Sequence, residues 1–430
     1  MQYAPLALLI LATCANLGRA QQLPPEQRGT VDTVVQVGVG WYQAAGGERQ
    51  NDPNPVARAL ELAAPGCTVV LDPGDYPAFS IGFTNRQNQS SMGTGGAPMR
   101  PVVVRGRNGA RIVAGADHDT IKIAQQYPVA HIRFENLEIQ AGQRSGVIFY
   151  TPPPDGSNLG FEFLDCTIDG GYDHARQEGR ESKWGVIAHG LKDFVFAGRN
   201  KRASVHSIRY EHAFYLQNPR GDMTLENIDA ARLGRTFVQV VAREKEGPAG
   251  QGRITLKGCK VEDTGLAQRD NFKGGTAFTF AGRLADCTIL VEDCSYRAGF
   301  EPELHKLTAN GMPYNTSALV AWDGRENQPN GALILRNNHF EMAPGTGDRP
   351  LVSIASCRSV SIEGDNRFLA GAHPVALVID PLDASGKPGG LPNGTVHVAL
   401  GTELRGALQV GGRTADESLR QELARTSAGR

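Results

Sequence analysis

Charged and aromatic side chains gather in four segments, residues 169–184, 197–212, 230–235 and 263–275, each flanked by short apolar stretches. Together the segments mix lysine, arginine and histidine with carboxylates. Fixed cations bind the carboxylates or sulfates of a sugar polymer, and a positioned base can remove a proton from a sugar ring. The pattern therefore predicts β-elimination on an acidic polysaccharide. The alternative, that each charge is only solvated or structurally ion-paired, stays open.

The expected roles follow from residue type. We expect His212 or Lys183 to act as the general base, and Tyr210 and Glu211 could orient or tune the imidazole. Tyr210 is also the expected proton donor, and Arg235 the cation that binds a sugar carboxylate. The side chains expected to bind substrate are Arg209, Glu211, Arg232 and Lys273. Ca²⁺ prefers clustered oxygens, and the candidate calcium ligands are Asp169, Asp173 and Glu178.

A repeated strand motif separates these segments. Residues 134–139 align with 163–168 and 191–196, and further copies begin at 225, 256, 291, 335 and 362. The third position is a marker, Asn, Asp or Gly, which recurs from Asn136 at steps of 29, 28, 34, 31, 35, 44 and 27 residues. Self-similarity at such a period is typical of a solenoid. Asn or Asp where the chain bends suits the left-handed backbone region.

A second series of short apolar strands lies between these copies, at 146–149, 185–188, 213–216, 236–239, 276–279, 317–320, 351–354 and 375–378. Such short strands bury their inner faces only by stacking coil on coil. We therefore expect an all-β fold, a single-stranded right-handed parallel β-helix of roughly eight or more coils. Leucine-rich repeats are disfavoured because helix-period segments are absent. In this register Lys183, Glu211, His212 and Arg235 start second-series strands in three successive coils.

The start of the repeat array carries a cap and a family resemblance. Asn54-Pro55, followed by Val56, Leu60 and Leu62, predicts a short helix that covers the open end of the solenoid. Residues 65–76, PGCTVVLDPGDY, resemble the opening turn of the pectate-lyase-like β-helix superfamily, and the repeats extend this resemblance over roughly residues 60–400. The resemblance implies the fold. It leaves the activity open, because the fold hosts lyases, hydrolases, esterases, epimerases and inert adhesins.

Composition and the amino terminus limit the partners and the location. Lys and Arg total 44 against 45 Asp and Glu, so nucleic acid is not an expected partner. The apolar run from Leu6 to Ala15 and the small residues Gly18 and Ala20 predict a signal peptide and a secreted or periplasmic protein, with a lipid anchor at Cys14 as the alternative. No later segment is long and apolar enough to span a bilayer. We expect a monomer with a signal peptide at 1–20, a linker at 21–52, the β-helix at 53–410 and a tail at 411–430.

Six cysteines remain after the predicted signal. Cys166, Cys259 and Cys294 occupy the repeat position where other copies carry Leu137, Phe194 and Ile228. We therefore expect buried free thiols that fill the core. No cysteine spacing indicates a zinc site.

Motifs of individual families narrow the activity. The chain lacks the adjacent Asp pair of polygalacturonases and the Trp-Ile-Asp-His motif of pectate lyases. This leaves more divergent lyases, such as the alginate and chondroitin group that uses Lys and Arg with calcium. Residues 193–198 and 233–237 also resemble pectin methylesterase motifs, which implies Asp193 as nucleophile, Asp173 as acid and base, and Arg235 as stabilising cation. Three functions stay open: a polysaccharide lyase, a non-catalytic carbohydrate-binding or structural envelope protein, and a carbohydrate esterase.

Overall fold

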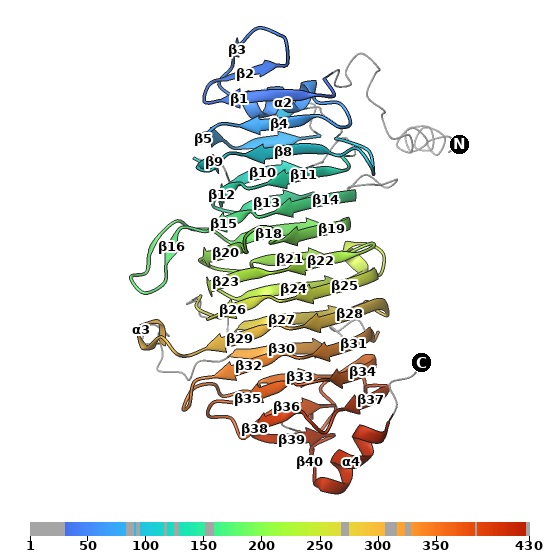
Figure 1. Ribbon diagram of the computed structural model, residues 1–430. Helices are drawn as coiled ribbons and strands as arrows, with labels where there is room; N and C mark the ends of the chain where they lie inside the picture. Colours follow the sequence, from blue (N-terminus) through green and yellow to red (C-terminus); the bar gives the residue numbers. More distant parts are fainter. Residues whose placement is uncertain are drawn as a thin grey trace, which may run out of the picture.

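The chain winds through three long, predominantly parallel β-sheets that form the walls of a solenoid (Figure 1). The computed structural model describes residues 31–82, 90–91, 95–115, 118–123, 129–150, 159–267, 275–305, 316–322, 328–382 and 385–426. Each coil contributes one strand to sheet 1, then one to sheet 2 and one to sheet 3, before the chain returns to sheet 1. We call the connections from sheet 1 to 2, from 2 to 3 and from 3 to 1 the first, second and third corners. The predicted parallel β-helix is confirmed.

Successive coils place their strands side by side in each sheet. Sheet 1 contains, in spatial order, β3 (Gln50–Asn51), β2 (Trp41–Ala44), β1 (Val34–Gly38), β4 (Thr68–Leu71), β8 (Val102–Gly106), β11 (Ile132–Glu135), β14 (Leu159–Leu164), β19 (Lys192–Ala197), β22 (Met223–Glu226), β25 (Gln251–Lys257), β28 (Asp286–Glu292), β31 (Asn330–Arg336), β34 (Cys357–Glu363) and β37 (Thr395–Val398). Sheet 2 contains β5 (Gly74–Pro77), β9 (Ala110–Val113), β12 (Glu138–Gln140), β15 (Thr167–Asp169), β20 (Ala203–Ile208), β23 (Ile228–Leu233), β26 (Lys260–Glu262), β29 (Ser295–Ala298), β32 (His339–Met342), β35 (Arg367–Leu369) and β38 (Glu403–Arg405). Sheet 3 contains β7 (Ser90–Ser91), β6 (Phe79–Ile81), β10 (Asp119–Ile123), β13 (Ser145–Phe149), β18 (Trp184–His189), β21 (Phe214–Gln217), β24 (Thr236–Ala242), β27 (Gly275–Gly282), β30 (Thr316–Trp322), β33 (Val352–Ile354), β36 (Val375–Ile379), β39 (Ala407–Val410) and β40 (Arg413–Thr414).

Extra elements cover the ends and side of the solenoid. The predicted amino-terminal helix is α2 (Pro55–Leu62), which lies against the first strands of sheets 1 and 3, whereas α4 (Glu417–Arg425) packs beside β37 at the other end (Figure 1). Strands β1, β2 and β3 lie within the expected linker at 21–52 and extend sheet 1 beyond the first coil as an antiparallel ribbon. A hairpin of β16 (Tyr172–Asp173) and β17 (Glu178–Gly179) and the short helix α3 (Pro302–His305) project from the second-corner side (Figure 1). No described helix is long and apolar enough to cross a membrane. The predicted signal peptide and Cys14 lie outside the described residues.

The marker residues sit at the first corner, as predicted, with one exception. Asn136, Asp165 and Asn227 have φ values of 52°, 58° and 53°, in the left-handed region that short polar side chains tolerate. The repeat at 191–196 was misaligned: β19 pairs with β14 so that Phe196 lies beside Phe163, and the first corner of this coil falls after Ala197. Asp193, with φ 54°, is instead the second residue of β19, next to the third corner.

Aromatic rings and free thiols fill the space between the sheets. Phe163 stacks between Phe134 and Phe196, with ring-centroid distances of 4.6 Å and 5.9 Å, and all three side chains are fully buried. Residues Cys67, Cys166, Cys259, Cys287, Cys294 and Cys357 are all buried and unbridged. Cys166, Cys259 and Cys294 each follow a first-corner marker, so the prediction of core-filling thiols is confirmed. The exception is Phe194, which lies at the start of sheet 1 and is not their counterpart.

Candidate functional site

A column of charged residues runs along the second corner, immediately before successive strands of sheet 3. Backbone hydrogen bonds join Lys183 to Glu211 (3.0 Å) and Glu211 to Arg235 (3.0 Å), and Arg144 precedes the neighbouring strand β13. Ser145 follows Arg144, Trp184 follows Lys183, and these two residues are paired between β13 and β18. Neighbouring strands lie about 4.8 Å apart. The structure therefore brings Lys183, Glu211 and Arg235 together, one per coil, and we call these three residues the charged column.

The cations at this corner differ in whether a carboxylate pairs with them. Arg235 Nη1 lies 3.2 Å from Glu211 Oε2, and Arg144 forms a two-point contact with the buried carboxylate of Asp119. Lys183, which is half-buried, forms no salt bridge with any described carboxylate. Lys183 is thus the cation in the column that keeps its charge available for an anionic ligand.

His212 lies beside this column but is closed off from solvent. Its side chain is buried (residue 2% exposed), its Nε2 lies 3.7 Å from Glu211 Oε2, and its buried Nδ1 has no hydrogen-bond partner among the described residues. Burial, with a smaller contribution from the Arg235 charge, holds the pKa of His212 well below its usual value. The imidazole is therefore neutral near pH 7, but in this structure it does not reach a substrate on the surface. Of the two expected bases, Lys183 is the accessible one.

An aromatic cluster borders the charged column. The Arg209 guanidinium lies over the rings of Tyr172 (4.7 Å) and Tyr210 (4.5 Å) and also contacts the Glu181 carboxylate. A small pocket of about 100 Å³ is lined by Tyr172, Arg209, Tyr210 and His174, among others. At these distances the guanidinium makes cation–π contacts with both rings. The predicted substrate-binding residue Arg209 and proton donor Tyr210 thus lie next to each other at the second corner.

Each of the three predicted calcium ligands makes its own local contacts. Asp169 lies 3.3 Å from His206 Nδ1 and accepts the backbone N–H of Gly171. Asp173 accepts the N–H groups of Ala175 and Arg176 within the hairpin turn, and Glu178 is exposed opposite it in the β16–β17 register. No group of three metal-binding side chains occurs in the described parts of the chain. The structure therefore does not assemble these residues into a calcium site.

Other predicted residues lie apart from the charged column. Arg232 pairs with Glu301 at 3.3 Å, and Lys273 lies outside the described residues. The segment 197–212, expected to project from one flank, actually includes β20, so that only its end belongs to the second corner. The residues of the esterase interpretation are also separated: Asp193 lies near the start of β19 in sheet 1, whereas Asp173 and Arg235 lie on second-corner connections. The structure does not bring the esterase trio together.

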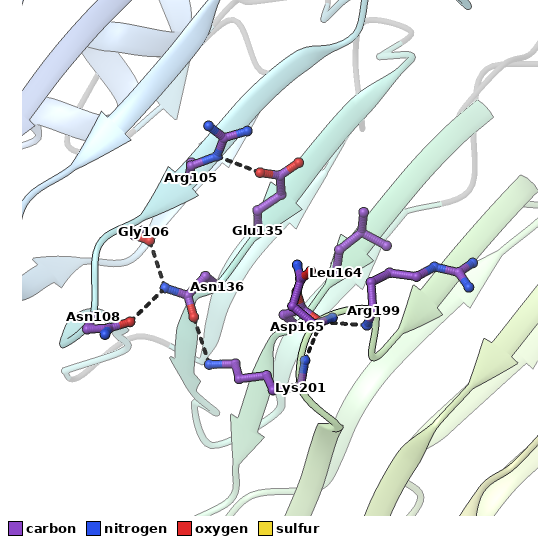
Figure 2. A pocket seen from close by; sticks show the side chains of 10 residues that line it. Arg105, Gly106, Asn108, Glu135, Asn136, Leu164, Asp165, Arg199 and Lys201 are labelled. Atoms are coloured by element: carbon purple, nitrogen blue, oxygen red, sulfur yellow. Dashed lines mark hydrogen bonds and ion pairs between the residues drawn. The ribbon is translucent and has the colours of Figure 1, made fainter.

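Sequence reasoning missed a pocket of about 540 Å³ at the first corner, shown in Figure 2. Its lining includes Arg199, Asn200 and Lys201, which belong to the connection between β19 and β20. A correct alignment of the β19 coil would have revealed this connection as an insertion. The misplaced marker at Asp193 concealed it.

Burial of His174 is expected to make the free energy of unfolding depend on pH. The side chain is buried (residue 5% exposed), its Nε2 bonds to the Ile208 carbonyl at 2.9 Å, and burial lowers its pKa from 6.5 to about 4. The unfolded chain binds the proton below pH 6.5, so the stabilisation from neutral His174 is present above that pH and lost as the pH falls to about 4. We expect the loss to reach about 3 kcal/mol. Denaturant unfolding of the parent and of His174→Phe between pH 7 and 4 should show a shallower pH slope in the variant.

Equal slopes in the parent and in His174→Phe would contradict the placement of a neutral histidine in the fold.

Comparisons with known proteins give fold-level likenesses only. No family model matches the chain, and no curated protein sequence matches it. Among solved structures, pectate lyase Pel9A is similar with a TM-score of 0.42 and 11% identity, covering 75% of this chain and 80% of that one. A mannuronic-acid-specific polysaccharide family 6 lyase from human gut microbiota is similar with a TM-score of 0.28 and 12% identity, covering 91% and 93% of the two chains. Likenesses this distant carry no argument about residues or activity.

Proposed function

We propose that the protein binds an acidic polysaccharide along the second corner and cleaves it by β-elimination. The observation that carries the proposal is the charged column, in which Lys183 and Arg235 lie on either side of Glu211. With a spacing of about 4.8 Å per coil, the backbones of Lys183 and Arg235 are about 10 Å apart. A sugar residue lying over Glu211 is therefore within reach of both long side chains. Arg209, whose guanidinium lies over the Tyr210 ring, borders this path.

The reaction assigns one step to each side chain. Lys183 Nζ, after losing its own proton to solvent, removes the proton from the ring carbon next to the sugar carboxylate, and Arg235 binds that carboxylate as charge develops on it. The C–H electron pair forms the new carbon–carbon double bond, and the bond to the leaving sugar oxygen breaks. The Tyr210 hydroxyl donates a proton to that oxygen, and solvent exchange returns Lys183 and Tyr210 to their starting states. Because substrate must compete with Glu211 for Arg235, binding includes rearrangement of that ion pair.

The proposed location is outside the cytoplasm, because the expected signal peptide would direct the protein there. In that location it would act as a monomer on extracellular or envelope polysaccharide. The non-catalytic alternative uses the same residues: a protein that only binds the acidic chain needs Lys183 and Arg235 but no proton transfer. Product formation distinguishes the two.

The test incubates the purified protein with pectate, alginate and glycosaminoglycans and follows the ultraviolet absorbance of the unsaturated sugar product. We expect absorbance to rise with at least one acidic glycan and to stay flat with a neutral glucan. Parallel reactions with a calcium chelator determine whether the reaction needs the metal. Binding to an acidic glycan without product would support the carbohydrate-binding alternative, and absence of both binding and product would overturn the proposal.

A further inference from the structure

The first corner between β19 and β20 is longer than every other first corner. Five residues, 198–202, connect these strands, against one to four in the other coils. In the coils on either side, the chain turns through the compact markers Asp165 and Asn227. A solenoid that turns with so few residues elsewhere does not need this extension for its own winding. Insertions on a regular repeat are where binding surfaces are commonly built.

The insertion is held firmly by the preceding coil. Asp165 Oδ1 accepts the backbone N–H groups of Arg199 (2.6 Å) and Asn200 (3.0 Å), and its Oδ2 accepts the Asn200 side-chain amide (2.7 Å). Burial raises the pKa of Asp165, but these hydrogen bonds outweigh it and leave the pKa lowered. Asp165 is therefore an anchoring carboxylate whose charge is already satisfied. The loop it anchors is preorganised, which lowers the entropic cost of binding.

From this loop Lys201 reaches back across two coils (Figure 2). Its Nζ lies 2.7 Å from the Asn136 side-chain oxygen, a neutral partner, and it forms no salt bridge with a described carboxylate. Asn136 is itself fixed by donating to the Gly106 carbonyl (2.9 Å). The exposed Lys201 ammonium therefore lines the pocket next to Asn136, whose side chain is already held by a hydrogen bond.

The pocket mixes charges, donors and acceptors over four successive coils, from β8 to β19. Arg105 and Arg199 each bond one carboxylate, Glu135 and Glu226 respectively, at 2.6 Å, while remaining about half-exposed. Three strand spacings make this path about 14 Å long, which suits a short oligomer better than a single inorganic anion. Amides and carboxylates beside the cations match sugar hydroxyls, which both donate and accept.

We propose that this first-corner pocket is a second binding site for an acidic saccharide, with Lys201 and Arg199 binding the anionic group of the sugar. The choice of an acidic sugar rests in part on the proposed function. The pocket lies on a different corner from the charged column, so it holds a polysaccharide without taking part in its cleavage. Two linked contacts on one polymer strengthen binding beyond either alone.

The experiment uses the full chain and an oligogalacturonate as probe, titrated by calorimetry. In a Lys183→Ala/Arg235→Gln background, which removes the charged column, we expect residual binding. Adding Arg199→Gln and Lys201→Gln should weaken that binding at least tenfold, which corresponds to about 1.4 kcal/mol. Asn136→Asp should weaken it too, because a carboxylate there occupies Lys201, and Asp adopts the same backbone turn at position 165. Lys192→Gln/Lys260→Gln removes two positive charges from β19 and β26, away from the pocket, and is the charge-matched control.

The outcomes separate this inference from the proposed function. Loss of binding in Arg199→Gln/Lys201→Gln supports the pocket even if no cleavage is found anywhere. Unchanged binding in both that variant and Asn136→Asp would overturn the pocket while leaving the lyase assay untouched. Competition by inorganic phosphate as strong as that by unlabelled oligogalacturonate would show a general anion site and would also contradict the proposal.

Discussion

Replacing Lys183 by alanine is expected to lower the rate of unsaturated-product formation by about 10²–10⁴-fold, the contribution of a positioned general base. Lys183 lies immediately before a strand of sheet 3, beside Glu211, and forms no salt bridge with the described carboxylates. Its loss should leave the thermal unfolding midpoint close to that of the parent. Initial rates on the glycan that gives product, combined with thermal unfolding, check both expectations.

The control for Lys183 is Lys192→Ala, since Lys192 is an exposed lysine on β19 away from the charged column. Its rate should match that of the parent. A Lys183→Ala variant that cleaves at the parental rate would remove Lys183 from the reaction, even if glycan binding were weaker.

Truncating Phe163 to alanine is expected to lower the free energy of unfolding by about 3–5 kcal/mol. The ring is fully buried between Phe134 and Phe196. Its loss leaves a cavity, because the surrounding strands keep Phe134 and Phe196 from moving together to fill the space. Denaturant titration followed by circular dichroism measures the change.

Phe300→Ala is the matched control for Phe163. This ring is 39% exposed and stacks only on the Arg297 guanidinium among its described ring contacts. We expect a change within about 0.5 kcal/mol. Similar losses in the two variants would contradict the placement of Phe163 in the core.

The architecture could be predicted because the repeat is local. Apolar alternation and a marker at each bend are determined by neighbouring residues, and Asn136 and Asp165 adopt the left-handed turn that their types favour. The misalignment of the β19 coil has the same origin. Asp193 also has a left-handed backbone, but near the start of β19, next to the third corner, and apolar residues follow it there as well. Local pattern alone does not distinguish two corners with the same turn chemistry.

The candidate site could be predicted only as a location. Strand register was enough to place Lys183, Glu211 and Arg235 in one column. The burial of His212 and the engagement of Glu211 with Arg235 depend on how connections from several coils pack, which residue spacing does not encode. For the same reason the contact between Lys201 and Asn136, 65 residues apart, had no sequence signal.

The most direct test of the central claim, that an acidic polysaccharide lies along the second corner, is a crystal structure of Lys183→Ala with a bound uronate oligosaccharide. We predict a sugar carboxylate within hydrogen-bonding distance of Arg235, with the chain running across the start of sheet 3 past Tyr210. Oligosaccharide bound elsewhere, with the charged column unoccupied and Arg235 still paired with Glu211, would contradict the account.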